Sequence, residues 1–172
     1  MRKILIVVDM QNDFVDQALG SPEAQAIVLN VVNKVSNYKY EDIYFTRDTH
    51  QSNYMETLEG KYLPVPHCIR NTEGWEIIPE LKLLSLECNI INKATFGFED
   101  WGGVFFGSED FEFELCGLCT DICVVSNALA LRMFYPNSKI TVDASCCAGT
   151  TPEKHAAALE VMKSCQIEVI NE

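Results

Sequence analysis

The sequence predicts a three-layer α/β/α sandwich, in which helices cover both faces of a mostly parallel, six-stranded sheet. Two observations favour this class. Short, nearly continuous apolar runs of strand length alternate with longer segments of helical spacing. The longer segments open with residues that typically cap helices. At 172 residues the chain has the length of one ordinary domain with one core, so we expect a single domain over residues 1–172.

The apolar runs define the expected strands. A strand that is apolar on both faces is buried between helices, as in parallel sheets of Rossmann-like type. The expected strands cover residues 3–8, 42–46, 89–92, 111–117, 139–143 and 167–170.

Three longer segments are expected to form helices, over residues 21–38, 120–134 and 151–165. The first and third open with Ser21 and Thr151, each followed by Pro and Glu, which is a helix-start pattern. For the second helix, the candidate caps are Thr120 and Asp121.

Composition excludes several classes of function. The formal net charge of −12 argues against duplex nucleic acid, which requires a basic surface. No apolar run is long enough to span a bilayer, and the opening MRKILIVVDMQNDF is typical of a strand rather than a signal peptide. We therefore expect a cytoplasmic protein without nucleic-acid or membrane partners.

The chain has eight cysteines, and the absence of a secretory signal favours reduced thiols over a disulfide framework. Four of them lie in or beside strand-like runs, where they are expected to pack as small hydrophobic residues. These four are Cys88, Cys116, Cys146 and Cys165.

Residues that follow the strands are the candidates for a functional site, because open parallel sheets bind ligands outside the carboxyl ends of their strands. The first four strands are followed by several chemically competent side chains. These are Asp9, then Asp48 and His50, then Lys93, and then the segment 119–123.

These residue types suit a cysteine hydrolase. Cys123 lies in the first turn of the expected helix, where the helix dipole and a nearby cation favour a thiolate. Asp9 is placed to take the thiol proton and return it to a leaving amine, while Lys93 steadies the anionic charges. The backbone N–H groups of Cys119 and Cys123 are candidates for an oxyanion hole.

Other interpretations of the same residues remain open at this stage. Asp9 is also typical of a turn, and Lys93 of a surface residue at a strand end. Cys116 and Cys119 form a CxxC pattern that would suit a redox pair or half of a metal site. The sequence has no second CxxC, which disfavours the metal interpretation.

Three motifs together resemble the isochorismatase-like cysteine hydrolases, a family that includes the nicotinamidases. They are VVDMQNDF (7–14), INKATF (91–96) and GLCTDICV (117–124), and their order along the chain matches that family. The resemblance extends over essentially all 172 residues. It implies the isochorismatase-like hydrolase fold.

The resemblance also implies roles for individual residues. The catalytic triad would be Asp9, Lys93 and Cys123. The family has a cis peptide before its oxyanion-hole residue, which here would join Leu118 to Cys119. Cys119 would then contribute its backbone only.

Two further stretches resemble the metal site of the nicotinamidase branch, namely RDTH (47–50) and LEGKYLPVPH (58–67). Two imidazoles and two carboxylates suit zinc or another borderline divalent ion, with manganese and iron as alternatives. The matching positions are Asp48, His50 and His67, with Glu59 as the additional carboxylate and Glu56 as the second choice.

The substrate pocket departs from the nicotinamidase pattern. That branch usually has an aromatic residue just before the prolines and the second metal histidine, whereas this chain has Leu63. Phe14 matches a pocket position of the family, and Phe96, Phe98 and Trp101 are further candidates, although core packing is the commoner role of such aromatics.

The resemblance implies an amidohydrolase, with nicotinamide as the leading substrate, nicotinate and ammonia as products and a thioester as intermediate. Alternatives are a ureidoacrylate- or carbamoyl-type amidohydrolase, or a non-catalytic scaffold that binds metal or thiols. A true isochorismatase fits less well, because those enzymes act on a vinyl ether and need no metal. A homo-oligomer is expected by resemblance, and the helical segment VVSNALALRMF (124–134) would serve either its interface or the core.

Overall fold

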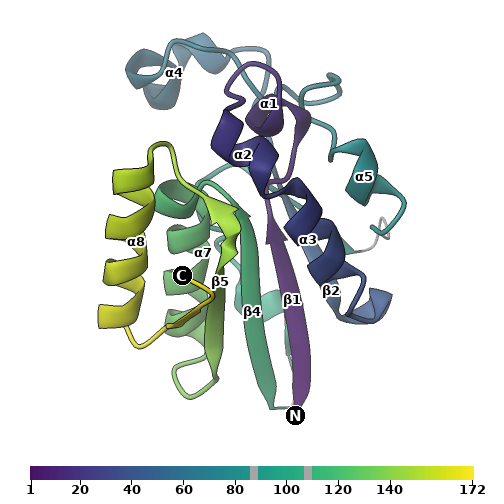
Figure 1. Ribbon diagram of the computed structural model, residues 1–172. Helices are drawn as coiled ribbons and strands as arrows, with labels where there is room; N and C mark the ends of the chain where they lie inside the picture. Colours follow the sequence, from purple (N-terminus) through teal and green to yellow (C-terminus); the bar gives the residue numbers. More distant parts are fainter. Residues whose placement is uncertain (86–88, 107–109) are drawn as a thin grey trace.

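The computed structural model describes residues 1–85, 89–106 and 110–172. Its sheet has six parallel strands in the order β3-β2-β1-β4-β5-β6 (Figure 1). All six strands lie close to the positions predicted from the sequence. Their bounds are Arg2–Val8 (β1), Ile43–Asp48 (β2), Ile90–Lys93 (β3), Phe111–Leu118 (β4), Ile140–Ala148 (β5) and Glu168–Ile170 (β6).

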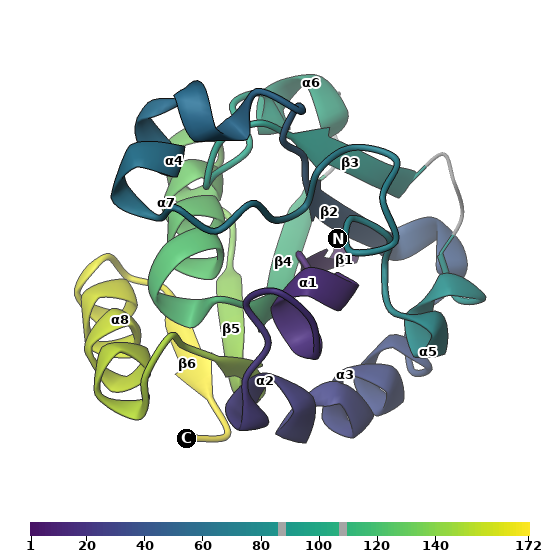
Figure 2. The same cartoon turned by 90° about the horizontal axis from the view of Figure 1, so that it is seen from above.

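Helices cover both faces of the sheet, which confirms the three-layer prediction. One face carries α2 and α3 and the other carries α7 and α8, while α1 and α4 lie at the carboxyl edge (Figures 1 and 2). The helices are Asn12–Val15 (α1), Pro22–Ala26 (α2), Val28–Val35 (α3), Leu58–Tyr62 (α4), Pro79–Lys82 (α5), Trp101–Val104 (α6), Val125–Phe134 (α7) and Pro152–Ser164 (α8). Among the described residues, none of these helices has the length and apolar character needed to cross a bilayer.

Two of the predicted helix caps are present. Ser21 Oγ accepts a hydrogen bond from the Ala24 N–H at 3.0 Å, and Thr151 Oγ1 accepts one from the Lys154 N–H at 3.2 Å. The segment predicted as one helix over 21–38 is divided at Ile27 into α2 and α3.

The cap predicted for the segment after β4 is wrong. This segment begins with a π-helical turn, Thr120–Val124, in which the Val124 N–H donates to the Cys119 carbonyl five residues back at 3.0 Å. The side chains have tertiary partners instead of capping the helix. Thr120 Oγ1 lies 2.8 Å from Nδ1 of His155, and the Asp121 carboxylate accepts from the N–H and hydroxyl of Thr150 at 2.8 and 2.7 Å.

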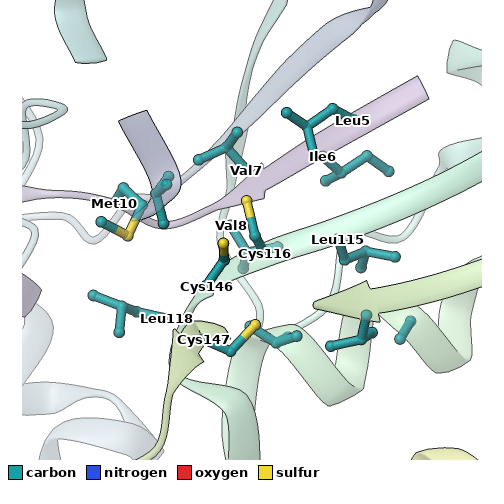
Figure 3. Packing of buried hydrophobic residues seen from close by; sticks show 14 of the residues in the cluster. Leu5, Ile6, Val7, Val8, Met10, Leu115, Cys116, Leu118, Cys146 and Cys147 are labelled. Atoms are coloured by element: carbon teal, nitrogen blue, oxygen red, sulfur yellow. The ribbon is translucent and has the colours of Figure 1, made fainter. Parts of the chain in front are cut away.

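The core is centred on β1 and β4, whose apolar residues pack under the helices (Figure 3). Cys116 and Cys146 are buried in it, as predicted, while Cys165 is half-buried. The cysteines that the structure describes are free thiols. Cys88 lies outside the described residues.

α7 packs mainly into the core, through Ala128 and Leu131, which are fully buried. Met133, near the end of the helix, is 71% exposed. The helix therefore contributes to the core, and its most exposed apolar side chain lies near its end.

A buried ionic cluster that the sequence did not reveal joins α3 to the sheet. Glu114 of β4 pairs with Lys34 and accepts hydrogen bonds from Lys3 at 2.6 Å and from the Tyr38 hydroxyl at 2.6 Å. Lys34 also contacts Asp143 of β5 at 2.7 Å. Burial raises the pKa of Glu114, but the hydrogen bonds from Lys3, Lys34 and Tyr38 outweigh burial and hold that pKa below 4.5.

Replacing Glu114 with Gln is expected to lower the free energy of unfolding at pH 7 by about 2 kcal/mol, because it removes charge-assisted hydrogen bonds. The wild-type carboxylate has a lower pKa folded than unfolded, so its contribution is present above pH 4.5 and is lost as the pH falls through the folded pKa. The variant should therefore lose less stability on acidification. Urea unfolding between pH 7 and pH 3 measures both effects. Glu112→Gln, on the same strand, is the control. Parallel profiles of stability against pH for Glu114→Gln and wild type would contradict the prediction.

Candidate active site

The three residues predicted as a catalytic triad lie together at the carboxyl edge of the sheet. Asp9 follows β1, Lys93 ends β3, and Cys123 belongs to the π-helical turn after β4. Lys93 Nζ lies 2.7 Å from Asp9 Oδ2 and 3.5 Å from Cys123 Sγ. All three side chains are buried, so the proton transfers that they could perform are shielded from bulk water.

Burial is the largest influence on the pKa values of Asp9 and Cys123. Burial raises the pKa of Asp9, and the positive charge of Lys93 offsets this effect only in part. Thr46 Oγ1 donates a 2.6 Å hydrogen bond to Asp9 Oδ1 and fixes the carboxylate. Burial and the charge of Asp9 also raise the pKa of the Cys123 thiol above its ordinary value of 9.0.

The sequence-based expectation of a resting thiolate at Cys123 is therefore not supported. The predicted stabilisation relied on a regular helix start, whereas the turn that carries Cys123 is π-helical and α7 begins only at Val125. Burial therefore disfavours the Cys123 thiolate, and the nearby Asp9 carboxylate is the group placed to remove the thiol proton.

The segment before Cys123 has the backbone form that the family resemblance implied. The peptide between Leu118 and Cys119 is cis. Gly117, just before it, has φ of 117°, and a Cβ at this position would lie 2.1 Å from the carbonyl oxygen of Val8. Only glycine therefore fits beside β1 at this position.

A second polar cluster adjoins the first. Asp48 ends β2, His50 follows two residues later, and His67 lies in the connection between α4 and α5. Asp48 Oδ2 lies 3.0 Å from Nε2 of His50 and 3.8 Å from Nε2 of His67, and one ligand atom from each residue lies within 4.8 Å of the others. The structure thus assembles the three predicted metal-binding positions.

The additional carboxylate near the imidazoles is that of Glu59. Its Oε1 lies 3.6 Å from His50 Nε2 and 3.7 Å from His67 Nε2, whereas Glu56 is exposed. The Thr57 side chain accepts a hydrogen bond from the Gly60 N–H at 3.0 Å and caps α4, the helix that carries Glu59.

The donor set fits a divalent metal. Nδ1 of His67 donates to the Val65 carbonyl at 2.8 Å, which leaves the Nε2 lone pair facing the cluster. Nε2 of His50 is buried and has no hydrogen-bond partner among the residues that the structure describes. Although burial raises the pKa of Asp48, the adjacent His50 and the charge of Lys93 lower it overall, so this carboxylate is available as an anionic ligand.

Gln11 fixes the backbone of this cluster, a role that the sequence did not reveal. Its side-chain oxygen accepts from the Asp48 N–H at 2.7 Å, and its side-chain nitrogen donates to the carbonyls of Asp48 and Trp75 at 2.9 and 2.8 Å. Gln11 lies within the VVDMQNDF motif, and this is the one feature of the sequence that indicates a role for it.

Asn127 is a second structural residue that the sequence did not reveal. Its side-chain oxygen accepts hydrogen bonds from the Phe98 N–H and the Trp101 indole at 2.9 and 3.2 Å. Its side-chain nitrogen donates to the carbonyls of Phe96 and Cys123 at 3.2 and 2.8 Å. Asn127 therefore ties the Cys123 turn to the segment after Lys93.

Replacing Asn127 with Asp is expected to destabilise the fold by about 3 kcal/mol, because two carbonyls lose their buried donor and face a carboxylate instead. Thermal or urea unfolding measures the change. Ser126→Ala is the control, since within the described part of the chain that hydroxyl bonds only the carbonyl of Ile122 in its own segment. Equal stability of the two variants would contradict the structural role of Asn127.

Both clusters open into a cleft of about 920 Å³. Phe14 and Phe96 line this cleft, as predicted from the sequence, and so does Leu63. The structure does not bring Phe98 into the cleft. Phe98 packs against the fully buried Trp101, with ring centroids 5.2 Å apart, so both residues belong to the core.

The chain belongs to the isochorismatase family, because the model of the isochorismatase domain matches residues 3–172. Among curated relatives, the nicotinamidase of Schizosaccharomyces pombe is 27% identical over 98% of this chain and 92% of its own length.

Solved structures agree with this assignment. The nicotinamidase/pyrazinamidase of Bacillus subtilis superposes with a TM-score of 0.81 at 26% identity, covering 99% of this chain and 100% of that chain. The pyrazinamidase of Pyrococcus horikoshii, solved in complex with zinc, gives a TM-score of 0.78 at 26% identity over 100% of both chains.

Proposed function

We propose that this amidohydrolase of the isochorismatase family converts nicotinamide and water to nicotinate and ammonia through a thioester on Cys123. The observation that carries the proposal is the contact of Lys93 Nζ with both Asp9 Oδ2 and Cys123 Sγ at the buried end of the cleft. The nicotinamidase relatives, matched over nearly their whole length, support the choice of substrate.

Asp9 begins the reaction by accepting the thiol proton of Cys123. Its raised pKa makes it a stronger base than an ordinary carboxylate, and the Lys93 ammonium stabilises the thiolate as it forms. The thiolate attacks the amide carbonyl, and the backbone N–H groups of Cys119 and Cys123 are the proposed donors to the oxyanion.

Collapse of the tetrahedral intermediate breaks the carbon–nitrogen bond. Asp9 returns its proton to the departing nitrogen, which leaves as ammonia. Asp9 then removes a proton from a water molecule, whose oxygen attacks the thioester and releases the acid and the Cys123 thiolate. Transfer of the proton from Asp9 to Cys123 restores the starting state.

Asp48, His50, Glu59 and His67 are the residues that would hold a metal, with zinc as the first choice and manganese or iron as alternatives. When bound, the metal would supply a Lewis acid for a ring nitrogen or a water. The relative solved in complex with zinc supports this assignment. Phe14, whose ring centroid lies 5.4 Å from that of His67, offers a flat apolar surface for a ring in the cleft.

One observation favours a second candidate, a ureidoacrylate- or carbamoyl-type amidohydrolase. Leu63 lines the cleft where the nicotinamidase branch usually has an aromatic residue, so one ring-stacking wall is missing.

Incubating the protein with nicotinamide and measuring nicotinate and ammonia tests the proposal. Ureidoacrylate and N-carbamoyl amines serve as competing substrates. Turnover of nicotinamide with a higher kcat/KM than these compounds is expected. Turnover of only the competing substrates would favour the second candidate.

A further inference from the structure

We infer that the cleft accepts carboxamides whose acyl group carries a bulky apolar substituent, and that this substituent lies at an apolar mouth formed by Leu58, Tyr62, Leu63 and Phe96. The inference rests on the proposed amide hydrolysis and extends it to a class of larger substrates. All four residues line the same cleft as Cys123 and Asp48.

The cleft is much larger than nicotinamide. A benzene ring is held by an apolar cavity of about 150 Å³, and a pyridine carboxamide adds only a few atoms to such a ring. The cleft here measures about 920 Å³, near the upper end of the roughly 300–1,000 Å³ typical of sites for drug-sized ligands. Nicotinamide alone would therefore leave most of this space unfilled.

Polar and apolar side chains occupy different ends of the cleft. Cys123, Asp48 and His67 are 4%, 3% and 2% exposed, so the reactive groups lie at the deep end. At the outer end, Leu58 is 71% exposed and Tyr62 is 85% exposed. A carboxamide bound at Cys123 would direct the remainder of its acyl group toward these apolar side chains.

Phe96 and Leu63 complete this outer surface. They are 48% and 37% exposed, respectively, and both line the cleft. Exposed apolar residues that are gathered around a cleft, rather than scattered singly, are typical of ligand-binding surfaces. A substituent that covered them would gain the hydrophobic free energy of burying several large side chains.

The part of the mouth formed by α4 is held in place by the fold. A Cβ at Gly60 would lie 2.2 Å from the Tyr54 carbonyl, so the helix packs directly on the preceding turn. The hydroxyl of the buried Tyr54 donates a hydrogen bond to the Leu63 carbonyl at 2.9 Å. Leu58 and Tyr62, four residues apart on this short helix, therefore share one fixed face toward the cleft.

The test compares kcat/KM for nicotinamide with kcat/KM for nicotinamides that carry a phenyl group meta or para to the carboxamide. We expect at least one phenyl derivative to exceed nicotinamide by about tenfold, the low end of what one added apolar group contributes in a fitting pocket. The ratio of the two kcat/KM values should fall about tenfold in Tyr62→Ser. It should be unchanged in Lys61→Ala, which alters an exposed residue of the same helix outside the cleft.

The outcomes separate this inference from the proposed function. Hydrolysis of nicotinamide with neither phenyl derivative accepted would overturn the inference alone. Hydrolysis of no carboxamide would defeat the proposed function and the inference together. A Tyr62→Ser variant that keeps the wild-type ratio but changes oligomeric state in size-exclusion chromatography would assign the mouth to a second copy of the chain and overturn the inference.

Discussion

Replacing Cys123 with Ala is expected to reduce kcat for amide hydrolysis by about 10⁴-fold or more, the scale observed when a hydrolase loses its nucleophile. Without the sulfur there is no thioester, and Asp9 and Lys93 are left with no group to activate. The pH dependence of the residual kcat should lack the contribution from the titration of Asp9 that the wild type shows, because Asp9 no longer activates a nucleophile.

Cys119→Ala is the matched control, because both thiols line the same cleft within one turn of each other. Truncation of this side chain leaves the backbone N–H in place, so kcat should change by less than about tenfold. Ammonia release and thermal unfolding should be measured on both variants, so that loss of activity is distinguished from loss of fold. Equal activity of the two variants would remove Cys123 from the mechanism.

Replacing His67 with Ala is expected to weaken zinc binding by more than about 100-fold, since even changes to residues that merely support metal ligands weaken binding 10- to 100-fold. The fold should survive, because the loop that carries His67 is also held by the Tyr54 hydrogen bond to Leu63 and by the Cys68 N–H, which donates to Asp13 at 2.7 Å. Elemental analysis after dialysis measures the retained metal.

Two glutamates of this segment provide a matched pair for the same measurement. Glu59→Gln should lower the retained metal, whereas Glu56→Gln should not, because only Glu59 faces the imidazoles. A chelator should lower the melting temperature of the wild type, since a ligand at about 1,000 times its Kd adds about 4 kcal/mol to the folded state. It should not change the melting temperature of His67→Ala. A wild-type protein that is fully active without metal would contradict the assignment of a catalytic metal.

Much of the site could be predicted from the sequence because of one geometric rule. Asp9, Asp48 and Lys93 each lie at or just beyond the end of a strand, and parallel strands bring their carboxyl ends to one edge of the sheet. Cys123 follows the next strand within a short connection and so reaches the same edge. The family resemblance then indicated which of these side chains act together.

The remaining features depend on tertiary contacts that leave no local pattern. Glu114 is a charged residue within a strand predicted to be buried, and its ion pair with Lys34 of α3 is a contact between distant segments. Asp121 is a residue type that often caps helices, but its carboxylate instead accepts hydrogen bonds from Thr150, in the loop after β5. Phe96 and Phe98 occupy an irregular segment, where no periodicity distinguishes a cleft residue from a core residue.

Intact-mass and peptide mass spectrometry of acid-quenched, steady-state reactions with nicotinamide would address the covalent step most directly. A nicotinoyl group is expected on the peptide that contains Cys123, present during turnover and lost when the substrate is exhausted. An acyl group mapped to Cys119, or steady turnover with no acylated cysteine in rapidly quenched samples, would contradict this expectation.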